Sequence, residues 1–358
     1  MPCERMILRG DRDPDLAADI AARLCRGAIV ALPTETVYGL AVDPRREDAV
    51  RRLRKAKGRE DAAPFTAHLA DASDLASLAA PVGPRARRLI DRYWPGPLTL
   101  ILPAIGGGTV GARVPASDFT REVIRRTGSH LFMTSANRAG EAPLCDAGAI
   151  AEAFGDSIDL VVDGGRSPLG SASTVLSVAA PLFCVLREGI LTADEVYRAA
   201  AQKILFVCTG NTCRSPLAEA FARKEAARRL SIPAAALPAR GLCFASAGTS
   251  TLPGMPVSEG SQAAAEEEGM DLRDLRTMDL STALAKGVDL VYGMTRSHVR
   301  AVEALGPDLA GRCRLLDPGG EDIADPYGKD LAIYRKARDQ IQRAVAARCE
   351  EWIEAISC

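Results

Sequence analysis

The spacing of apolar residues changes its character near residue 200. Before that point, apolar positions that recur every three or four residues predict amphipathic helices over 15–26, 48–57 and 84–93. Short apolar runs between and after them predict strands at 28–32, 66–70, 98–102, 131–134, 160–163, 174–178 and 183–187. Several short strands among helices indicate an α/β domain with a mixed, twisted sheet.

Beyond residue 202 apolar strands alternate regularly with helices. Residues 203–208 end in the apolar run ILFVC, which is typical of a strand buried on both faces. The pattern that follows predicts strands at 243–246 and 289–293 and helices at 216–230, 257–269, 296–304 and 330–356. This alternation favours a doubly wound parallel sheet. We therefore place a boundary at 199–202 and expect two α/β domains, residues 1–199 and residues 200–358.

Length and charge agree with this division. A single hydrophobic core rarely grows past about 250–300 residues, and the chain has 358. Hydrophobic residues make up 47% and charged residues 25%, which excludes a mainly disordered chain. Because 45 Lys and Arg nearly balance 46 Asp and Glu, no overall field draws the chain to double-stranded DNA or a membrane, and any anion site must be local.

The sequence also bears on the compartment in which the chain works. No apolar run approaches the roughly 18–20 residues of a membrane span, and the first residues lack the apolar core of a signal peptide. We expect a cytoplasmic location, where the ten cysteines stay mostly reduced. With three His and no CxxC pair, a zinc site is not expected.

The most informative motif runs from Cys208 to Pro216, with the sequence CTGNTCRSP. A thiol ends a buried strand, and Arg214 follows just before a helix start that suits Pro216. Such a loop directs backbone N–H groups and the helix dipole at one point, where an anion binds. The guanidinium of Arg214 adds a forked pair of N–H donors that matches the geometry of a phosphate. The same positive field favours the thiolate form of Cys208, which is nucleophilic. Ser215 can donate a hydrogen bond to this thiolate. A buried structural Cys with a surface Arg is the alternative, and the all-apolar strand and Gly-Asn turn count against it.

Transfer of a phosphoryl group also needs a proton donor for the leaving group. Asp325 lies in the turn DPYG before the last predicted helix and is the best candidate for this acid. Loop carboxylates are usually only solvated, so this prediction depends on Cys208.

Four blocks in order resemble the low-molecular-weight protein tyrosine phosphatase family: ILFVCTGNTCRSPLAEAFAR, SAGTSTLPGMPVSEG, DLVYGMTRSHVRAV and DPYGKDLAIYRKARDQI. The resemblance covers about 203–358. It implies Cys208 as nucleophile, Arg214 as phosphate clamp and Asp325 as general acid, without a cofactor. It further implies that Asn211 holds the loop, that Ser215 tunes the thiolate, and that Cys213 forms a reversible disulfide with Cys208.

The identity of the phosphorylated residue stays open. Thr212 stands where tyrosine-specific members usually carry a larger apolar residue, and this loop resembles that of the bacterial protein-arginine phosphatases. A branched hydroxyl narrows the pocket and offers a polar contact to phosphoarginine, whereas an apolar wall would support phosphotyrosine. Arsenate reduction is not expected, because residues 244–312 contain no cysteine to relay a disulfide.

Lysine is rare in the chain, with seven residues against 38 Arg, and before residue 203 it occurs only as Lys55 and Lys57. Both lie in 51–59, where six of nine residues are basic. This segment is either a solvated helix face or RNA patch, or a helix end that grips a polyphosphate. The lack of nearby aromatic residues counts against single-stranded RNA. Because no Walker A or GxGxxG loop is present, the motifs alone indicate only an anion-binding domain.

Seven further blocks resemble the threonylcarbamoyl-AMP synthase family, which has the YrdC-like fold: LPTETVYGLAVDP, KAKGR, YWPGPLTLIL, VGARVP, TSANRAG, STV and VLREG. The resemblance covers about 7–195. It implies condensation of L-threonine, bicarbonate and ATP, with Mg²⁺, into threonylcarbamoyl-AMP and pyrophosphate. The product feeds the tRNA-modification machinery that makes threonylcarbamoyladenosine. Carried over by position, threonine would contact Thr36, His68, Arg113 and Ser173, and ATP would contact Lys57, Arg59, Thr109, Ser135, Asn137 and Arg187.

The sequence departs from this family pattern at several positions that bear on nucleotide binding: Glu60, Ala63, Phe65, Arg138, Ala139 and Pro143. Glu60 beside Arg59 weakens the local positive potential. Two functions therefore remain. In the first, both domains catalyse separate reactions. In the second, the N-terminal domain is a nucleotide- or RNA-binding module that regulates an active phosphatase.

Overall fold

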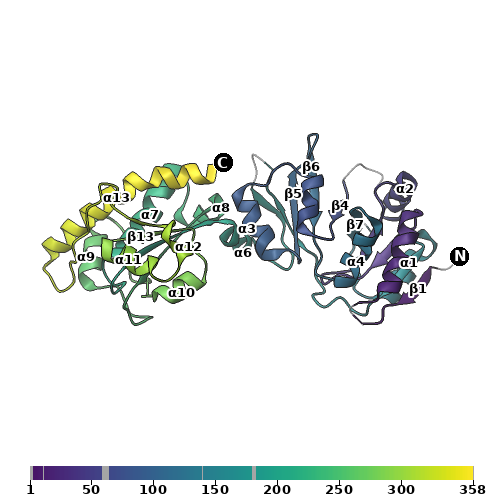
Figure 1. Ribbon diagram of the computed structural model, residues 1–358, viewed down its shortest axis with the longest axis horizontal. Coiled ribbons are helices and arrows are strands. Elements are labelled where there is room, and N and C mark those ends of the chain that lie inside the picture. The colour runs from purple at the N-terminus through teal and green to yellow at the C-terminus, as the bar shows by residue number, and fades with distance from the viewer. Residues whose placement is uncertain (1–2, 11, 59–63, 139, 180–182, 358) are drawn as a thin grey trace. The chain divides into compact units, whose positions relative to one another are not determined.

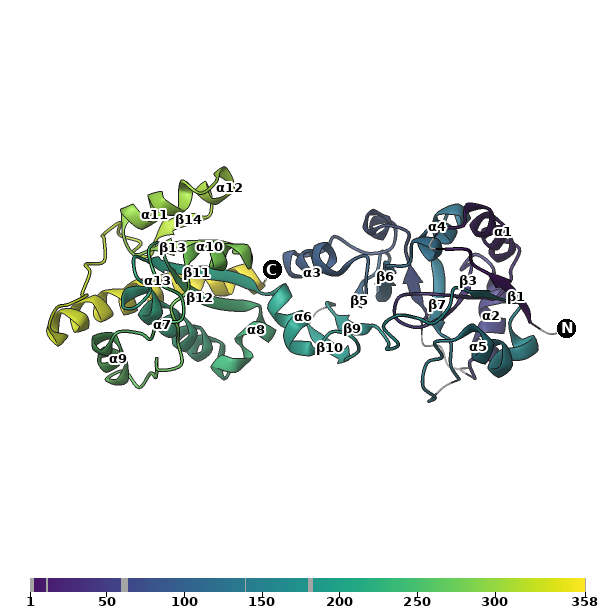
Figure 2. The same ribbon diagram turned by 90° about the horizontal axis from the view of Figure 1, so that it is seen from below.

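The computed structural model describes residues 3–10, 12–58, 64–138, 140–179 and 183–357 of the chain. It divides into two compact units, Met1–Ala199 and Ala200–Cys358. Figures 1 and 2 show the elements of each unit from two directions. The chain division falls at the last residue of helix α6 (Ala193–Ala200), and the first strand of the second unit starts at Gln202.

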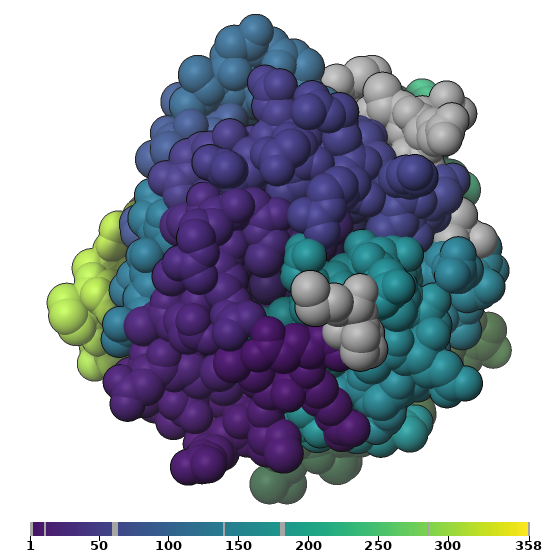
Figure 3. Space-filling model, turned by 90° about the vertical axis from the view of Figure 1, so that its right-hand side faces the viewer, coloured from purple at the N-terminus to yellow at the C-terminus, as the bar shows by residue number. Residues whose placement is uncertain are grey.

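The first unit is built on one mixed sheet of ten strands. Parallel pairs (β1 with β8, β8 with β2, β4 with β6, β5 with β9) are interspersed with antiparallel pairs. The strand order across the sheet is β1 (Glu4–Ile7), β8 (Leu160–Asp163), β2 (Val30–Leu32), β3 (Gly39–Val42), β7 (Leu131–Ser135), β4 (Thr66–His68), β6 (Thr109–Arg113), β5 (Leu98–Pro103), β9 (Thr174–Ser177) and β10 (Cys184–Arg187). In Figure 3 the purple N-terminal residues adjoin teal residues from the middle of the chain, in agreement with the pairing of β1 and β8.

Helices cover both faces of one half of this sheet. Alternate residues of a strand point to opposite faces, so Leu160 and Val162 of β8 pack with α1 (Pro14–Cys25) and α4 (Asp118–Thr127). Val161 packs on the other face with α2 (Glu47–Ala56) and α5 (Ala147–Phe154). Helix α3 (Pro84–Tyr93) follows the segment that contains the short 3-10 helix Ala72–Ser77.

The second unit has four parallel strands in the order β12 (Leu242–Gly248), β11 (Gln202–Cys208), β13 (Leu290–Gly293) and β14 (Cys313–Leu315). Ile204 and Phe206 of β11 pack toward α7 (Arg214–Leu230) and the long α13 (Leu331–Ser357), which lie side by side in Figures 1 and 2. Leu205 and Val207 pack toward α10 (Leu280–Ala285) and α11 (Arg296–Glu303) on the opposite face. The remaining helices are α8 (Leu237–Arg240), α9 (Glu259–Glu266) and α12 (Pro307–Ala310).

Both fold predictions are confirmed: the first unit is an α/β unit with a mixed sheet, and the second has an all-parallel sheet covered on both faces. In the second unit an aromatic cluster anchors the last helix. Trp352 of α13 packs against Phe206, Phe244 and Tyr292, and its indole N–H donates to the Tyr292 hydroxyl at 3.0 Å. In the first unit the indole of Trp94 donates to the Leu98 carbonyl at 2.7 Å. Among the described residues, even the 27-residue α13 does not combine the length and the apolarity of a membrane span.

Candidate active sites

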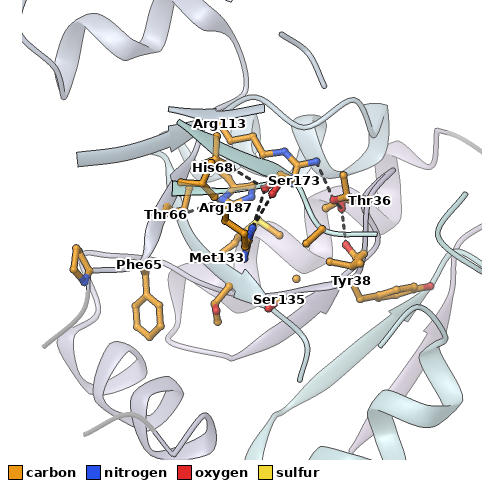
Figure 4. Close-up of a pocket in the computed structure, with 18 of the residues that line it drawn as sticks. Thr36, Tyr38, Phe65, Thr66, His68, Arg113, Met133, Ser135, Ser173 and Arg187 are labelled. Atoms are coloured by element: carbon orange, nitrogen blue, oxygen red, sulfur yellow. Dashed lines mark hydrogen bonds between the residues drawn. The ribbon is translucent and has the colours of Figure 1, made fainter. Parts of the chain in front are cut away.

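A pocket of about 180 Å³ opens in the first unit (Figure 4). It lies over the half of the sheet that runs, in spatial order, through β3, β7, β4, β6, β5, β9 and β10. Its lining comes from strand residues and from three loop segments, 34–38, 64–65 and 172–173. Hydroxyl, imidazole and guanidinium groups dominate its polar surface. Six of the residues predicted to contact threonine or ATP line it: Thr36, His68, Arg113, Ser135, Ser173 and Arg187.

Arg113 is the buried cation of this pocket. Its Nε donates to the Gly96 carbonyl at 3.0 Å, and its Nη2 donates to Glu35 Oε1 at 2.5 Å and Thr36 Oγ1 at 2.9 Å. Burial lowers the pKa of Arg113, and the Glu35 carboxylate opposes that shift. Glu35 accepts a second hydrogen bond, from the Ala116 N–H at 3.0 Å. The guanidinium is therefore held in one orientation, as a binding site for a carboxylate requires.

His68 is neutral at physiological pH. Burial, and then the charge of Arg113, lower the pKa of His68 to about 3. Its Nδ1 lies 3.2 Å from the Thr66 carbonyl, which can only accept, so the ring proton is on Nδ1. Nε2 is consequently an acceptor, and His68 can receive a hydrogen bond from a ligand but cannot act as an acid.

Two hydroxyls and a second guanidinium complete the wall formed by β5, β9 and β10. Ser173 Oγ lies 2.9 Å from Thr99 Oγ1. Arg187, exposed on the edge strand β10, donates from Nη2 to the Ser173 carbonyl at 2.9 Å. Figure 4 shows Arg187 directed at Ser173. The pocket thus presents one buried and one exposed cation, which suits a ligand with two separated anionic groups.

Lys57 ties the end of α2 to the loop after β7. The side chain is buried, and its Nζ donates to the Ser135 carbonyl at 2.7 Å, to Asn137 Oδ1 at 3.2 Å and to the Asn137 carbonyl. Ser135 Oγ lies 2.5 Å from the same Asn137 Oδ1. Asn137 Nδ2 donates to the carbonyls of Arg138 and Glu141 at 2.8 Å each. Lys57 and Asn137 therefore support the pocket residue Ser135 from outside the pocket.

In the second unit a loop joins Cys208, the last residue of β11, to the start of α7. Asn211 adopts a left-handed conformation (φ 53°), which Asn tolerates better than most residues. Its Oδ1 accepts from the Met278 N–H at 2.8 Å and its Nδ2 donates to Ser215 Oγ at 2.9 Å. These bonds hold Asn211 in this conformation and connect the middle of the loop to the first turn of α7.

Cys208 lies at the floor of this loop, buried and 3.0 Å from Ser215 Oγ. Because Ser215 Oγ already accepts from Asn211, its own hydrogen is available for Cys208 Sγ or for the Ala247 carbonyl at 3.3 Å. A hydroxyl that donates to sulfur stabilises the thiolate form. The arrangement is suited to a nucleophilic thiol.

Arg214 points its guanidinium at the segment before α13. Nη1 donates to the Ile323 carbonyl at 3.1 Å and Nη2 donates to Asp325 Oδ2 at 2.6 Å. The side chain is only 4% exposed. Among the described residues Arg214 Nε has no hydrogen-bond partner. An unpaired buried N–H is costly, and a phosphate oxygen would satisfy it.

A pocket of about 610 Å³, larger than the pocket described in the first unit, lies over this loop. Cys208, Thr212, Cys213 and Arg214 belong to its lining, and Asp325 lies at the same pocket. Exposed apolar side chains form its walls: Leu252, Met255 and Tyr327.

Comparison with known proteins assigns both units to families. A model described as telomere recombination, which covers the Sua5, YciO and YrdC proteins, matches residues 22–189. A model described as low molecular weight phosphotyrosine protein phosphatase matches residues 203–357.

The threonylcarbamoyl-AMP synthase of Nitrosococcus oceani is 35% identical over 161 residues, which cover 42% of this chain and 87% of that protein. The chain joins a threonylcarbamoyl-AMP synthase family domain to a low-molecular-weight phosphatase family domain. Both resemblances found in the sequence are thereby confirmed.

Two further relatives of the synthase domain agree. The threonylcarbamoyl-AMP synthase of Bacillus subtilis is 38% identical over 194 residues, covering 51% of this chain. A solved structure of Pyrococcus abyssi Sua5 is 30% identical with a TM-score of 0.51, and the match covers 57% of this chain and 71% of that one. The chain spans only about half of the Bacillus subtilis and Pyrococcus abyssi synthases, 56% and 57% of their lengths.

Not every predicted residue of the synthase domain reaches its pocket. Thr109 is exposed at the start of β6, where it pairs with Pro103, and it does not line the pocket. Arg113 is four residues further along the same strand, which corresponds to about 13 Å. Arg59, Glu60 and Ala63 lie outside the described residues.

Of the other departures from the family pattern, Ala139 also lies outside the described residues, whereas Phe65, Arg138 and Pro143 lie within them. Phe65 lines the synthase pocket and lies under the guanidinium of Arg54, 5.0 Å from the ring centroid. Pro143 is not among the pocket residues.

The structure also adds residues that sequence reasoning missed. In the synthase domain, Glu35 orients Arg113, and its place beside Thr36 in PTET was the available signal. In the phosphatase domain, His298 Nε2 lies 3.0 Å from Thr209 Oγ1 and its Nδ1 lies 2.9 Å from Thr295 Oγ1. Burial, then the charge of Arg214, lower the pKa of His298 to about 4, so the ring is neutral. It supports the residue that follows Cys208.

Cys213 has an environment of its own. Its Sγ is 3.2 Å from Ser258 Oγ, 3.7 Å from the Tyr334 hydroxyl and 3.5 Å from Thr212 Oγ1. Cys208 and Cys213 are both free thiols in this structure. The disulfide between them remains a prediction.

Proposed function

We propose that the chain is a bifunctional enzyme. The synthase domain makes threonylcarbamoyl-AMP from L-threonine, bicarbonate and ATP, and the phosphatase domain hydrolyses phosphoarginine or phosphotyrosine in proteins. The gathering of Thr36, His68, Arg113, Ser173 and Arg187 in one pocket supports the first activity. The loop that surrounds Cys208 supports the second.

In the synthase domain, the fixed guanidinium of Arg113 would hold the carboxylate of L-threonine. Neutral His68 would accept a hydrogen bond from the ligand through Nε2, and the hydroxyls of Thr36 and Ser173 would orient it. Formation of the carbamate and transfer of the adenylate both develop negative oxygens, and preorganised donors stabilise them.

The nucleotide would bind beside Ser135, with Arg187 at its phosphates and with Lys57 and Asn137 holding the loop. Arg59 is proposed for the same role on its position in the KAKGR motif. Among the described residues no cluster of three or more His, Cys, Asp or Glu could hold a metal ion. Mg²⁺ bound to the ATP phosphates would supply positive charge to the departing pyrophosphate.

Pyrophosphate release tests the synthase activity. We expect release that requires L-threonine, bicarbonate and ATP together, and that Arg113→Ala abolishes. Arg113→Ala removes the side chain held by Gly96, Glu35 and Thr36, so its folding is checked by circular dichroism. ATP or RNA binding with no pyrophosphate release would instead favour a regulatory module.

In the phosphatase domain, Cys208 Sγ would attack phosphorus while Arg214 and the loop N–H groups hold the equatorial oxygens. The bond from phosphorus to the leaving group breaks, and Asp325 gives that group a proton. Water then attacks the phosphocysteine, Asp325 takes its proton, and inorganic phosphate leaves the regenerated thiolate.

Cys208→Ser tests this mechanism. We expect it to abolish hydrolysis of both phosphoarginine and phosphotyrosine while pyrophosphate release by the synthase domain stays at the wild-type level. Residual hydrolysis near wild type would exclude Cys208 as the nucleophile. Loss of both activities would indicate a folding defect, which circular dichroism detects.

A further inference from the structure

The pocket above Cys208 carries more negative than positive charge. Three charged residues line it: Arg214, Glu259 and Asp325. Arg214 is buried and already donates to Asp325 at 2.6 Å. Glu259 therefore adds a carboxylate that no cation of the pocket lining balances.

The backbone holds Glu259 next to the loop of the nucleophile. Glu259 is the first residue of α9 and is exposed. The N–H of the preceding Ser258 donates to the Thr212 carbonyl at 2.9 Å, and Ser258 Oγ lies 3.2 Å from Cys213 Sγ. Thr212 and Glu259 thus belong to the same part of the pocket wall.

This charge pattern restricts the ligand. A phosphate dianion near Cys208 is repelled by the Glu259 carboxylate unless the substrate brings a positive charge of its own. In phosphoarginine a cationic, planar guanidinium is bonded directly to phosphorus, and such a group matches a carboxylate. In phosphotyrosine the corresponding group is a neutral phenyl ring, which leaves the repulsion in place.

The apolar walls do not make this distinction. Leu252 and Met255 can cover the aliphatic stem of an arginine or the face of a phenyl ring. The exposed ring of Tyr327 can stack on a guanidinium or on a tyrosine ring. Selectivity between the two substrates therefore depends on the polar residues of the mouth.

We propose that Glu259 selects phosphoarginine over phosphotyrosine by binding the guanidinium next to phosphorus. The proposal rests on the phosphatase function proposed above. Cys208 Sγ forms a bond to phosphorus and the P–N bond breaks. Its electron pair stays on the guanidine nitrogen, which takes a proton from Asp325. Glu259 keeps its own proton state throughout and acts by charge.

Two peptides that differ only in the phosphorylated residue, and contain no other cationic residue, test this role. In the full chain, Glu259→Gln should lower kcat/KM for the phosphoarginine peptide about three- to fivefold, the scale of an exposed ion pair. It should leave kcat/KM for the phosphotyrosine peptide unchanged or higher. Glu266→Gln, an exposed residue at the other end of α9, is the matched control and should change neither value.

Salt separates a charge effect from a structural one. Raising the salt concentration to about 1 M should remove most of the difference between wild type and Glu259→Gln, because exposed charges are then screened. Equal changes for both peptides, or none, in a wild-type enzyme that hydrolyses them would overturn the role of Glu259 and leave the phosphatase function standing. Failure of the wild type to hydrolyse either peptide would overturn the phosphatase function and this proposal together.

Discussion

Arg214 donates from Nη2 to Asp325 Oδ2 across 2.6 Å, so the proposed phosphate clamp and the proposed proton donor are paired with each other. Arg214 is buried and Asp325 is half exposed. A phosphate dianion that enters the loop competes with Asp325 for the same guanidinium. Substrate binding and the release of Asp325 toward the leaving group are therefore linked.

Asp325→Asn should slow hydrolysis in proportion to the need for a proton. For aryl phosphates with poor leaving groups we expect kcat to fall about 10²–10³-fold, and for good leaving groups much less, because these depart without protonation. A leaving-group series measured at one pH checks this. Equal slowing across the series would contradict the acid role.

The same substitution should tighten binding of phosphate analogues. Asp325→Asn removes a carboxylate that competes for Arg214, so the inhibition constant of vanadate should fall about three- to tenfold. Asp322→Asn is the control, because Asp322 accepts from the Arg296 N–H and not from Arg214. Weaker inhibition in Asp325→Asn would mean that the carboxylate helps to hold the oxyanion.

Thr212→Ile should shift the phosphatase toward phosphotyrosine. The substitution replaces a hydroxyl in the pocket lining by an apolar branch, which supports a phenyl ring and removes a polar contact to a guanidinium. We expect the ratio of kcat/KM for phosphoarginine to that for phosphotyrosine to fall about tenfold. An unchanged ratio would show that Thr212 does not contact the part of the substrate beyond phosphorus.

Lys57→Met should destabilise the synthase domain and impair nucleotide binding. It leaves the carbonyls of Ser135 and Asn137 without their donor in a buried site, which costs about 2–4 kcal/mol. Urea unfolding followed by circular dichroism measures the loss. Lys55→Met, exposed on the same helix, should change stability by less than about 0.5 kcal/mol. Similar losses for both variants would contradict the structural role of Lys57.

Acid should weaken the synthase domain through His68. The folded pKa of about 3 lies below the ordinary value of 6.5, so between these values the unfolded chain binds one more proton and acidification favours unfolding. The free energy of unfolding that is lost in this way is about 1 kcal/mol between pH 6.5 and pH 5.5. Urea unfolding at pH 6.5 and 5.5 should show a smaller pH effect in His68→Gln than in wild type. An identical pH effect would show that the pKa of His68 is the same in the folded and unfolded states, and would contradict its lowering by burial.

The sequence predicted the elements with a strong local signal. The apolar run before Cys208 and the regular alternation after it were sufficient for the parallel sheet of the phosphatase domain. Strand β3 was missed because Gly39–Val42 is short and begins with glycine. Helix α4 was also missed, although the cap Ser117 and the left-handed Gly128 mark its two ends. Local pattern could not give the order of ten strands, since that order depends on pairings far apart in the chain.

The sites show the same limit. Motif spacing was enough to propose Cys208, Arg214 and Asp325, although Arg214 and Asp325 lie 111 residues apart in the sequence. It could not show that Glu35 holds Arg113 across 78 residues, because partner choice for a buried charge depends on the folded sheet. Motif spacing also could not show that Thr109 lies away from the pocket, because β6 carries a polar residue at each end, Thr109 and Arg113.

The two tryptophans of the sequence are divided between the units, Trp94 in the first and Trp352 in the second. Each indole is buried and donates a hydrogen bond, to a backbone carbonyl in one case and to a tyrosine hydroxyl in the other. Trp94→Phe and Trp352→Phe would each leave a single tryptophan, whose emission can be excited selectively at the red edge of its absorption. Emission from the intact chain would then report the unfolding of one domain at a time, and a ligand for either active site could be assigned to its domain by which signal shifts.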